Sequence, residues 1–156
     1  MQDQGMRTFA SAGELLAAVG EVLGHSEWRE ITQEQINLFA EATGDHQWIH
    51  VDVEKAAAGP FGTTIAHGFM SLSLLPVLVS GVYRVQGSRM GINYGLDKVR
   101  FPAPLPVGSK VRATVQLLSA DDLGEGWLQL KNKVTVEREG QEKPVCVAES
   151  LTRLLL

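Results

Sequence analysis

Phe69-Met-Ser-Leu-Ser-Leu-Leu-Pro-Val-Leu-Val79 is the stretch of sequence that decides the fold. Read as a helix, it is apolar almost all the way round, and helices of this kind are buried inside a protein. The wider apolar run, residues 68–82, is shorter than the ~20 residues that cross a bilayer, and Pro76 interrupts it. We therefore expect a buried central helix over residues 69–79, and no membrane span.

The sequence after Met90 changes to the alternation that is typical of strands. One predicted strand presents four apolar residues on one face: Val111, Ala113, Val115 and Leu117. Further strands are predicted over residues 127–139 and 145–155, with turns over 121–126 and 139–141. Long strands joined by tight turns indicate an antiparallel sheet. We therefore predict an α+β fold in which a curved antiparallel sheet wraps the central apolar helix.

Helical periodicity in the first half of the chain predicts helices over residues 14–23 and 33–43. Thr32 has the position of an N-cap for the second helix, and Gln35, three residues later, completes the pattern of a capping box. Gly44 is suited to the left-handed conformation that often ends a helix. A loop whose direction is fixed by this glycine is therefore expected to begin at Asp45.

Composition narrows the class of protein. The 156 residues fit one domain over residues 1–156. A net charge of -4 provides no basic face for nucleic acid. Cys146 is the only cysteine, so no disulfide can form within the chain, and we expect a cytoplasmic location. These features predict a soluble globular protein that binds neither nucleic acid nor a membrane.

Asp45 and His50 are the strongest candidates for acid/base chemistry. Residues five apart lie on opposite faces of a strand and roughly 140° apart around a helix, so both reach one small molecule only if the segment turns. An imidazole titrates near neutrality and a partly desolvated aspartate can approach it, which lets the pair hold a water and move its proton. The alternative is structural, with Asp45 capping a turn and His50 satisfied in the core.

Gly68 follows His67 and opens the apolar helix, where the first backbone amides have no acceptor within the helix and lie at the positive end of its dipole. A glycine has no Cβ to keep a carbonyl oxygen from its N–H. Such a donor can stabilise the enolate of a thioester. The alternative is a glycine that lets the helix start close to a neighbouring segment. Ser73 can support His50, although its own helix carbonyl competes for the hydroxyl.

Other patterns are weaker. His46 and His50, with His67, could ligate zinc from a helix, but Gly44 favours a loop and the helical metal motif is missing, so we predict no metal site. Residues 59–64 resemble a phosphate loop only in their glycines, because no lysine accompanies them. They are better explained as a turn that leads to His67.

Three motifs together resemble a known family: Phe39-Ala-Glu-Ala-Thr-Gly-Asp-His-Gln-Trp-Ile-His50, Ala66-His67-Gly68, and Val99-Arg-Phe-Pro-Ala-Pro104 with Val107-Gly108. They look like those of the MaoC-like, R-specific enoyl-CoA hydratases, and are most similar to the subgroup related to nodulation protein N. The likeness extends from about Thr32 to the C-terminus. It implies the hot-dog fold, in agreement with the wrapped helix inferred from the pattern of the sequence.

The resemblance also implies roles for individual residues. Asp45 and His50 would hold the catalytic water, the Gly68 amide would form the oxyanion site, and Ser73 would take the place of the family's helix serine. The implied contacts with coenzyme A are Ile65, Ala66, His67, Gly91, Ile92, Asn93, Tyr94, Pro102, Ala103 and Pro104. Coenzyme A is part of the substrate, no separate cofactor is implied, and a homodimer is expected. One departure is that Gln47-Trp48 replaces the usual Asn-Pro.

The expected activity is therefore that of a lyase of fatty acid metabolism, the reversible hydration of a trans-2-enoyl-CoA to an R-3-hydroxyacyl-CoA. The base is assigned to the Asp45–His50 pair as a unit, because the titrations of two such neighbours are coupled. Two alternatives stay open. A hot-dog acyl-CoA thioesterase would need a carboxylate on the central helix, where the first turns offer only Ser71 and Ser73. A non-catalytic acyl-CoA-binding module would keep the pocket without turnover.

Overall fold

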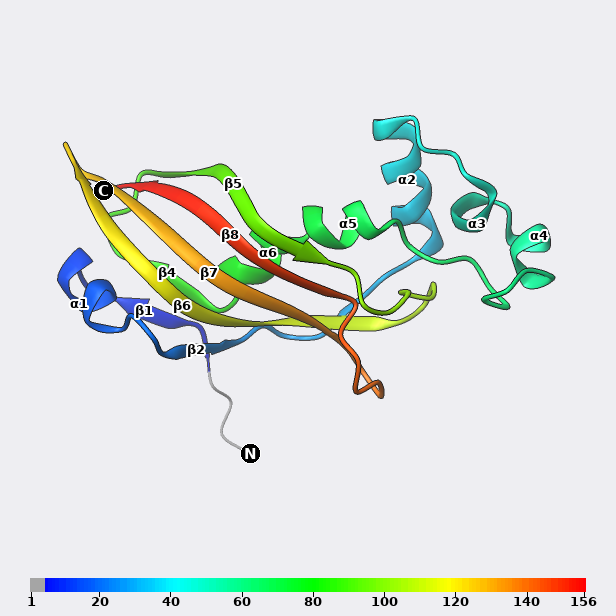
Figure 1. Cartoon of the computed structure of the whole chain (residues 1–156), viewed down its shortest axis with the longest axis horizontal. Coiled ribbons are helices and arrows are strands. Elements are labelled where there is room, and N and C mark those ends of the chain that lie inside the picture. The colour runs from blue at the N-terminus through cyan, green and yellow to red at the C-terminus, as the bar shows by residue number, and fades with distance from the viewer. Residues whose placement is uncertain (1–4) are drawn as a thin grey trace.

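An antiparallel sheet takes up most of the second half of the chain (Figure 1). The computed structural model describes residues 5–156, so residues 1–4 of the predicted domain lie outside the described part. The strands of this sheet are β2 (Val22–His25), β3 (Arg29–Glu30), β5 (Met90–Arg100), β6 (Lys110–Gly124), β7 (Trp127–Arg138) and β8 (Cys146–Leu155). Their order is β2-β6-β7-β8-β5, with β3 also beside β6. A smaller sheet pairs β1 (Arg7–Phe9) with β4 (Tyr83–Val85) in parallel.

The predicted strands are confirmed, and one turn is corrected. The four apolar residues that alternate through β6 are all fully buried, as their spacing predicted. The turn predicted over residues 121–126 is shorter, because β6 continues to Gly124 and pairs there with Trp127. Glu125 and Gly126 alone make the turn, with φ of 56° and 84°. Two residues with positive φ are what a tight hairpin of right-handed twisted strands requires.

The helix α2 (Gln33–Thr43) has the bounds that the sequence predicted. The Thr32 hydroxyl accepts from the Gln35 amide at 3.2 Å, and the Gln35 side chain accepts from the Thr32 amide at 3.0 Å, which completes the capping box. Gly44 ends the helix with φ of 80°. These local signals therefore fix the point at which the chain enters the loop of Asp45.

The helix predicted over residues 14–23 is wrong in extent. The structure has a short helix, α1 (Ala12–Ala17), capped by the Ser11 hydroxyl, and the chain then turns through Gly20 with φ of 95°. Leu23 belongs to β2 rather than to a helix. The apolar spacing of this segment suited both a helix and a strand, and the pairing of β2 with β6 decided between them.

The central helix is broken and covered on one side only. It consists of α5 (Gly68–Ser73) and α6 (Leu75–Ser80), separated at Leu74. Pro76 has no N–H, and its ring opposes the carbonyl one turn earlier, which accounts for the break. The sheet lies along one face of this helix, as predicted, while the other face is open in the single chain, where Phe69 is 69% exposed.

Among the described residues, no helix is both long and apolar enough to span a membrane. The helices α2, α3 (Trp48–Val51) and α4 (Val53–Ala57) gather at one end of the sheet (Figure 1). From this group the chain leads directly into α5, which runs back along the sheet. The start of α5 therefore lies beside the loop between α2 and α3, where the candidate acid/base residues are found.

Candidate active site

His50 is held in α3 by hydrogen bonds on two sides. Its side chain is buried, and Nδ1–H donates to the Ile65 carbonyl at 2.7 Å. Since a carbonyl oxygen can only accept, Nδ1 carries the hydrogen and a neutral ring leaves the lone pair on Nε2. The Gln33 side chain donates to the His50 carbonyl at 2.8 Å and accepts from the Thr64 hydroxyl. The segment carrying His50 is therefore tied both to α2 and to the strand-like segment before α5.

His67 forms the other wall of the site. It is buried, and its Nε2–H donates to the Asp45 carbonyl at 2.9 Å. Its ring stacks on His50 with centroids 3.8 Å apart and contacts Phe39 at 4.9 Å. His67 thus holds the Asp45 backbone through a hydrogen bond and holds the His50 ring through stacking. Its Nδ1 is buried and has no hydrogen-bond partner within residues 5–156.

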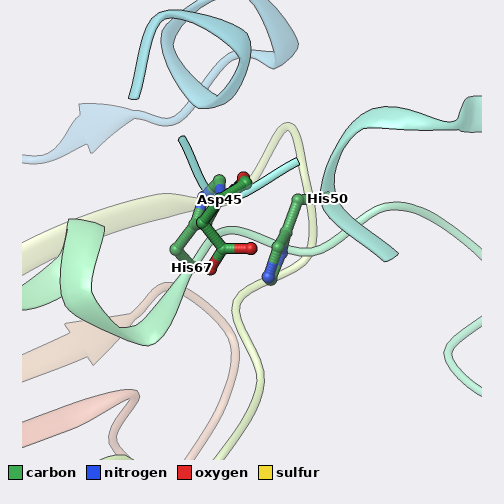
Figure 2. A group of neighbouring side chains, drawn as sticks. All are labelled: Asp45, His50 and His67. Carbon is green, nitrogen blue, oxygen red and sulfur yellow. Dashed lines mark hydrogen bonds between the residues drawn. The ribbon is translucent and has the colours of Figure 1, made fainter. Parts of the chain in front are cut away.

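Asp45 stands at the start of the loop that Gly44 opens. Its Oδ1 accepts from the Gln47 amide at 3.3 Å, so the carboxylate also caps this loop, as the structural alternative allowed. Oxygen and nitrogen atoms of Asp45, His50 and His67 lie within 4.8 Å of one another. Figure 2 shows the three side chains converging, with the carboxylate pointing toward the His50 ring.

This arrangement suits a water molecule. An ionised carboxylate only accepts hydrogen bonds, and Nε2 of neutral His50 is also an acceptor. A water that donates one hydrogen to each of two acceptors holds them roughly 4 to 5 Å apart, and the Asp45 carboxylate lies within 4.8 Å of a His50 ring nitrogen. Asp45 and His50 can therefore orient a water and remove its proton.

The surroundings of His50 keep its ring neutral. Burial lowers the pKa of His50 from its ordinary value of 6.5, which is the largest effect. The bond to Ile65 raises this pKa, nearby His67 lowers it, and the Asp45 charge raises it. The net direction is downward, so near neutral pH the ring is in the form that accepts a proton.

This lowered pKa determines how a reaction that uses His50 as its base should depend on pH. Because the lowered pKa of His50 keeps the ring neutral, kcat/KM should hold its plateau through pH 6.5 and fall only in more acidic solution. The unfolded chain binds a proton on this histidine near pH 6.5, before the folded protein does, so stability should also decline as the pH drops from 6.5 through the folded pKa. A kcat/KM profile and urea unfolding midpoints across this range measure both effects. An activity limb centred above pH 6.5 would contradict the assignment.

The Gly68 amide is the third predicted group. It begins α5, and no hydrogen-bond acceptor for it is found among residues 5–156. A Cβ at this position would lie 3.1 Å from Cγ and Cδ2 of Phe101. The glycine therefore serves the close packing that was the alternative explanation, and it leaves a free N–H at the same time.

The remaining predicted residues are spread over several places. The Ser73 hydroxyl donates to the Phe69 carbonyl at 2.8 Å, the competing bond expected for a helix serine. Ile65, Ala66 and His67 are buried. Residues 91–94 lie on exposed β5, and residues 102–104 follow its other end. At ~3.3 Å per residue, Tyr94 is roughly 23 Å along the strand from Phe101, so one chain does not gather these residues on a single patch.

Two neighbouring residues that the sequence singled out can also be placed. His46 is exposed, with Nε2 3.5 Å from a Glu41 carboxylate oxygen, and it does not join the cluster of His50 and His67. Trp48, at the departure from Asn-Pro, packs against Gly59 and lies under the Lys55 ammonium at 4.7 Å. Its ring therefore supports the turn that precedes His67.

Three residues that position this site were missed in the sequence. Gln33 of α2 bonds to the His50 carbonyl and to the Thr64 hydroxyl, and so it connects α2 to α3 and to the segment before α5. The Phe101 ring packs against Gly68. Phe101 lies within the quoted motif of residues 99–104, but no local pattern gives these three residues their roles, because their partners are 17 to 33 positions away in the chain. Only the fold brings them to the site.

Comparison with known proteins gives a consistent result. The MaoC like domain model matches residues 14–138. A 3-hydroxyacyl-thioester dehydratase Z from Mycobacterium tuberculosis is 64% identical over 148 residues, which is 95% of this chain and 98% of the relative. Nodulation protein N from Rhizobium leguminosarum bv. viciae is 44% identical over 144 residues, 91% and 89% of the two chains. A solved structure, a monoamine oxidase regulatory protein from Archaeoglobus, has a TM-score of 0.73 at 24% identity and covers 97% of each chain.

The curved antiparallel sheet with its broken central helix is thus the hot-dog fold, as predicted. This chain belongs to the MaoC-like family, and its likeness to nodulation protein N is confirmed. Several of the relatives are dehydratases by name, which supports a hydro-lyase.

Proposed function

We propose that this protein catalyses the reversible hydration of trans-2-enoyl-CoA to R-3-hydroxyacyl-CoA. The observation that carries the proposal is the convergence of Asp45 and His50: a carboxylate oxygen of Asp45 and a ring nitrogen of His50 lie within 4.8 Å of each other. His67 holds the Asp45 backbone at this site through its hydrogen bond to the Asp45 carbonyl. The names of the dehydratase relatives agree with this chemistry.

In the proposed reaction, Asp45 and His50 accept hydrogen bonds from one water and take one of its protons. The remaining hydroxide oxygen bonds to Cβ of the substrate, and the electrons of the double bond move onto the thioester oxygen. The Gly68 N–H donates to that oxygen as its charge develops, since no acceptor within residues 5–156 occupies this donor. The proton taken from water then returns to Cα, so atoms and charge balance.

A dimer is part of the proposal. β5 is an edge strand of the sheet, and its apolar side chains are exposed, with Tyr94 at 55% and Met90 at 49%. A long apolar edge readily pairs with another strand. A second copy of the chain along β5 would cover this edge, and it would bring a second set of residues toward the exposed face of α5.

The direct test is a hydration assay with crotonyl-CoA and longer trans-2-enoyl-CoA substrates. The absorbance of the conjugated thioester should fall, and chiral analysis should give the R-3-hydroxy product. Release of free thiol together with the unsaturated acid, and without a 3-hydroxy product, would instead identify a thioesterase. Thermal stabilisation by acyl-CoA without turnover would identify a binding module.

A further inference from the structure

A cavity of about 630 Å³ lies along the helices, beyond the acid/base cluster. Its walls come from the helices α5 and α6 and from the strands β4, β5, β7 and β8. Most of its lining is apolar, including Leu72, Leu75, Val79, Leu130 and Leu151. The size and lining are those of a pocket for a mainly apolar ligand.

One buried residue departs from this apolar character. The inward-facing side chains of β7 are Leu128, Leu130, Asn132, Val134 and Val136, all buried. Asn132 is 2% exposed and lines the cavity, yet its Oδ1 has no hydrogen-bond partner within the described residues. A buried carbonyl oxygen without a donor is costly, so such a group in an apolar row calls for a partner.

Tyr83 completes a polar pair in the cavity wall. The Asn132 amide donates to the Tyr83 hydroxyl at 3.0 Å, and Tyr83 also lines the cavity. Burial raises the pKa of Tyr83, so the phenol keeps its hydrogen. No hydrogen bond among residues 5–156 uses that hydrogen. The pair therefore offers one free donor, Tyr83 O–H, beside one free acceptor, Asn132 Oδ1.

We propose that this cavity binds acyl chains that carry a hydroxyl group remote from the thioester, and that Asn132 and Tyr83 receive this hydroxyl. A hydroxyl both donates and accepts, so it can donate to Asn132 Oδ1 and accept from Tyr83. The inference deepens the proposed function, on which it rests for the identity of the ligand as an acyl-CoA.

The extent of the cavity along the helices bounds the distance of the hydroxyl from the thioester. The lining helices run from Leu72 to Ser80, four to twelve residues past Gly68. At ~1.5 Å per residue this is roughly 6 to 18 Å from the Gly68 amide. An extended chain advances about 1.2 Å per bond, so the hydroxyl is expected near the middle or the end of a chain of medium length.

Binding of unreactive ligands tests the inference without relying on turnover. Dodecanoyl-CoA is compared by calorimetry with its analogues hydroxylated at the eighth, tenth or twelfth carbon. At least one analogue should bind about tenfold more tightly or better than the unsubstituted chain, because a site built for a hydroxyl leaves its polar groups unpaired without one. Asn132→Leu should abolish this preference while the unsubstituted chain still binds, and Tyr83→Phe, which removes a single oxygen, should weaken it.

The control is Lys133→Leu, the same kind of change on the exposed face of the same strand, which should keep the preference. Equal binding of all four ligands by the unaltered protein would overturn the inference, as would failure of all four to bind. The enoyl forms of the same chains are then assayed for hydration. If the hydroxylated chains bind more tightly but no enoyl form is hydrated, the hydratase proposal fails and the hydroxyl site stands. If the enoyl forms are hydrated but all chains bind equally, the hydroxyl site fails and the hydratase proposal stands.

Discussion

Asp45→Asn and His50→Gln are each expected to lower kcat/KM for crotonyl-CoA hydration by about 10²- to 10⁴-fold, the range that a positioned acid or base contributes. Asparagine replaces a carboxylate that only accepts with an amide that also donates, so the water loses one acceptor and faces an N–H. Glutamine can still donate to the Ile65 carbonyl that now accepts from His50, but it offers no basic nitrogen to the water.

The two side chains are expected to act as one unit. The double variant should therefore be hardly slower than either single variant, because removing one acceptor already leaves the water without its orientation. Enoyl absorbance with crotonyl-CoA measures all three rates, and urea unfolding shows whether the variants stay folded. Losses that multiply in the double variant would mean that the residues act independently.

Matched controls separate this role from general effects of the substitutions. His46→Gln alters a histidine of the same loop that is exposed beside Glu41, and Asp121→Asn alters an exposed aspartate of β6. Both should keep nearly full activity. Retention of more than a tenth of the activity in Asp45→Asn and His50→Gln would contradict the assignment of the acid/base pair.

Local patterns predicted the parts of this fold that depend on local interactions. The capping box of Thr32 and Gln35 joins residues three apart, and it placed the start of α2 correctly. The alternation of apolar and polar residues through β6 predicts which side chains face the core, and this prediction does not depend on which strand pairs with β6. Gly44 marked the point at which the loop of Asp45 begins, because only a residue tolerant of positive φ ends a helix in this way.

Tertiary contacts decided the rest. The segment after α1 forms the strand β2 because it pairs with β6. The apolar spacing of the segment gives no information about this pairing. Asn132 is a polar residue in an apolar row of β7, and its role depends on Tyr83, 49 positions earlier. The same holds for Phe101, whose contact with Gly68 explains by close packing why residue 68 is a glycine, in addition to the proposed role of its amide.

Gly68→Ala is the substitution that distinguishes the two explanations. The added methyl group would stand 3.1 Å from the Phe101 ring, so the ring or the helix must move by a few tenths of an ångström. It would also stand beside the amide that is proposed to meet the thioester oxygen. Loss of an oxyanion donor costs about 10²- to 10³-fold in kcat, and because the N–H itself remains in alanine, a decrease of about 10- to 100-fold is expected.

The pair of variants Gly68→Ala and Gly68→Ala/Phe101→Ala resolves the cause. Removing the ring takes away the clash but leaves the methyl group beside the amide. If the amide binds the oxyanion, kcat for crotonyl-CoA should stay low in the double variant when it is compared with Phe101→Ala alone. Recovery of kcat to the value of Phe101→Ala would show that Gly68 serves packing only.

Gly13→Ala, at an exposed position of α1 with room for a methyl group, is the control for the glycine-to-alanine change itself. Because the Asp45 and His50 variants test the water and the Gly68 variants test the oxygen, the two sets probe opposite ends of the same conjugated thioester, and a hydratase requires both to respond.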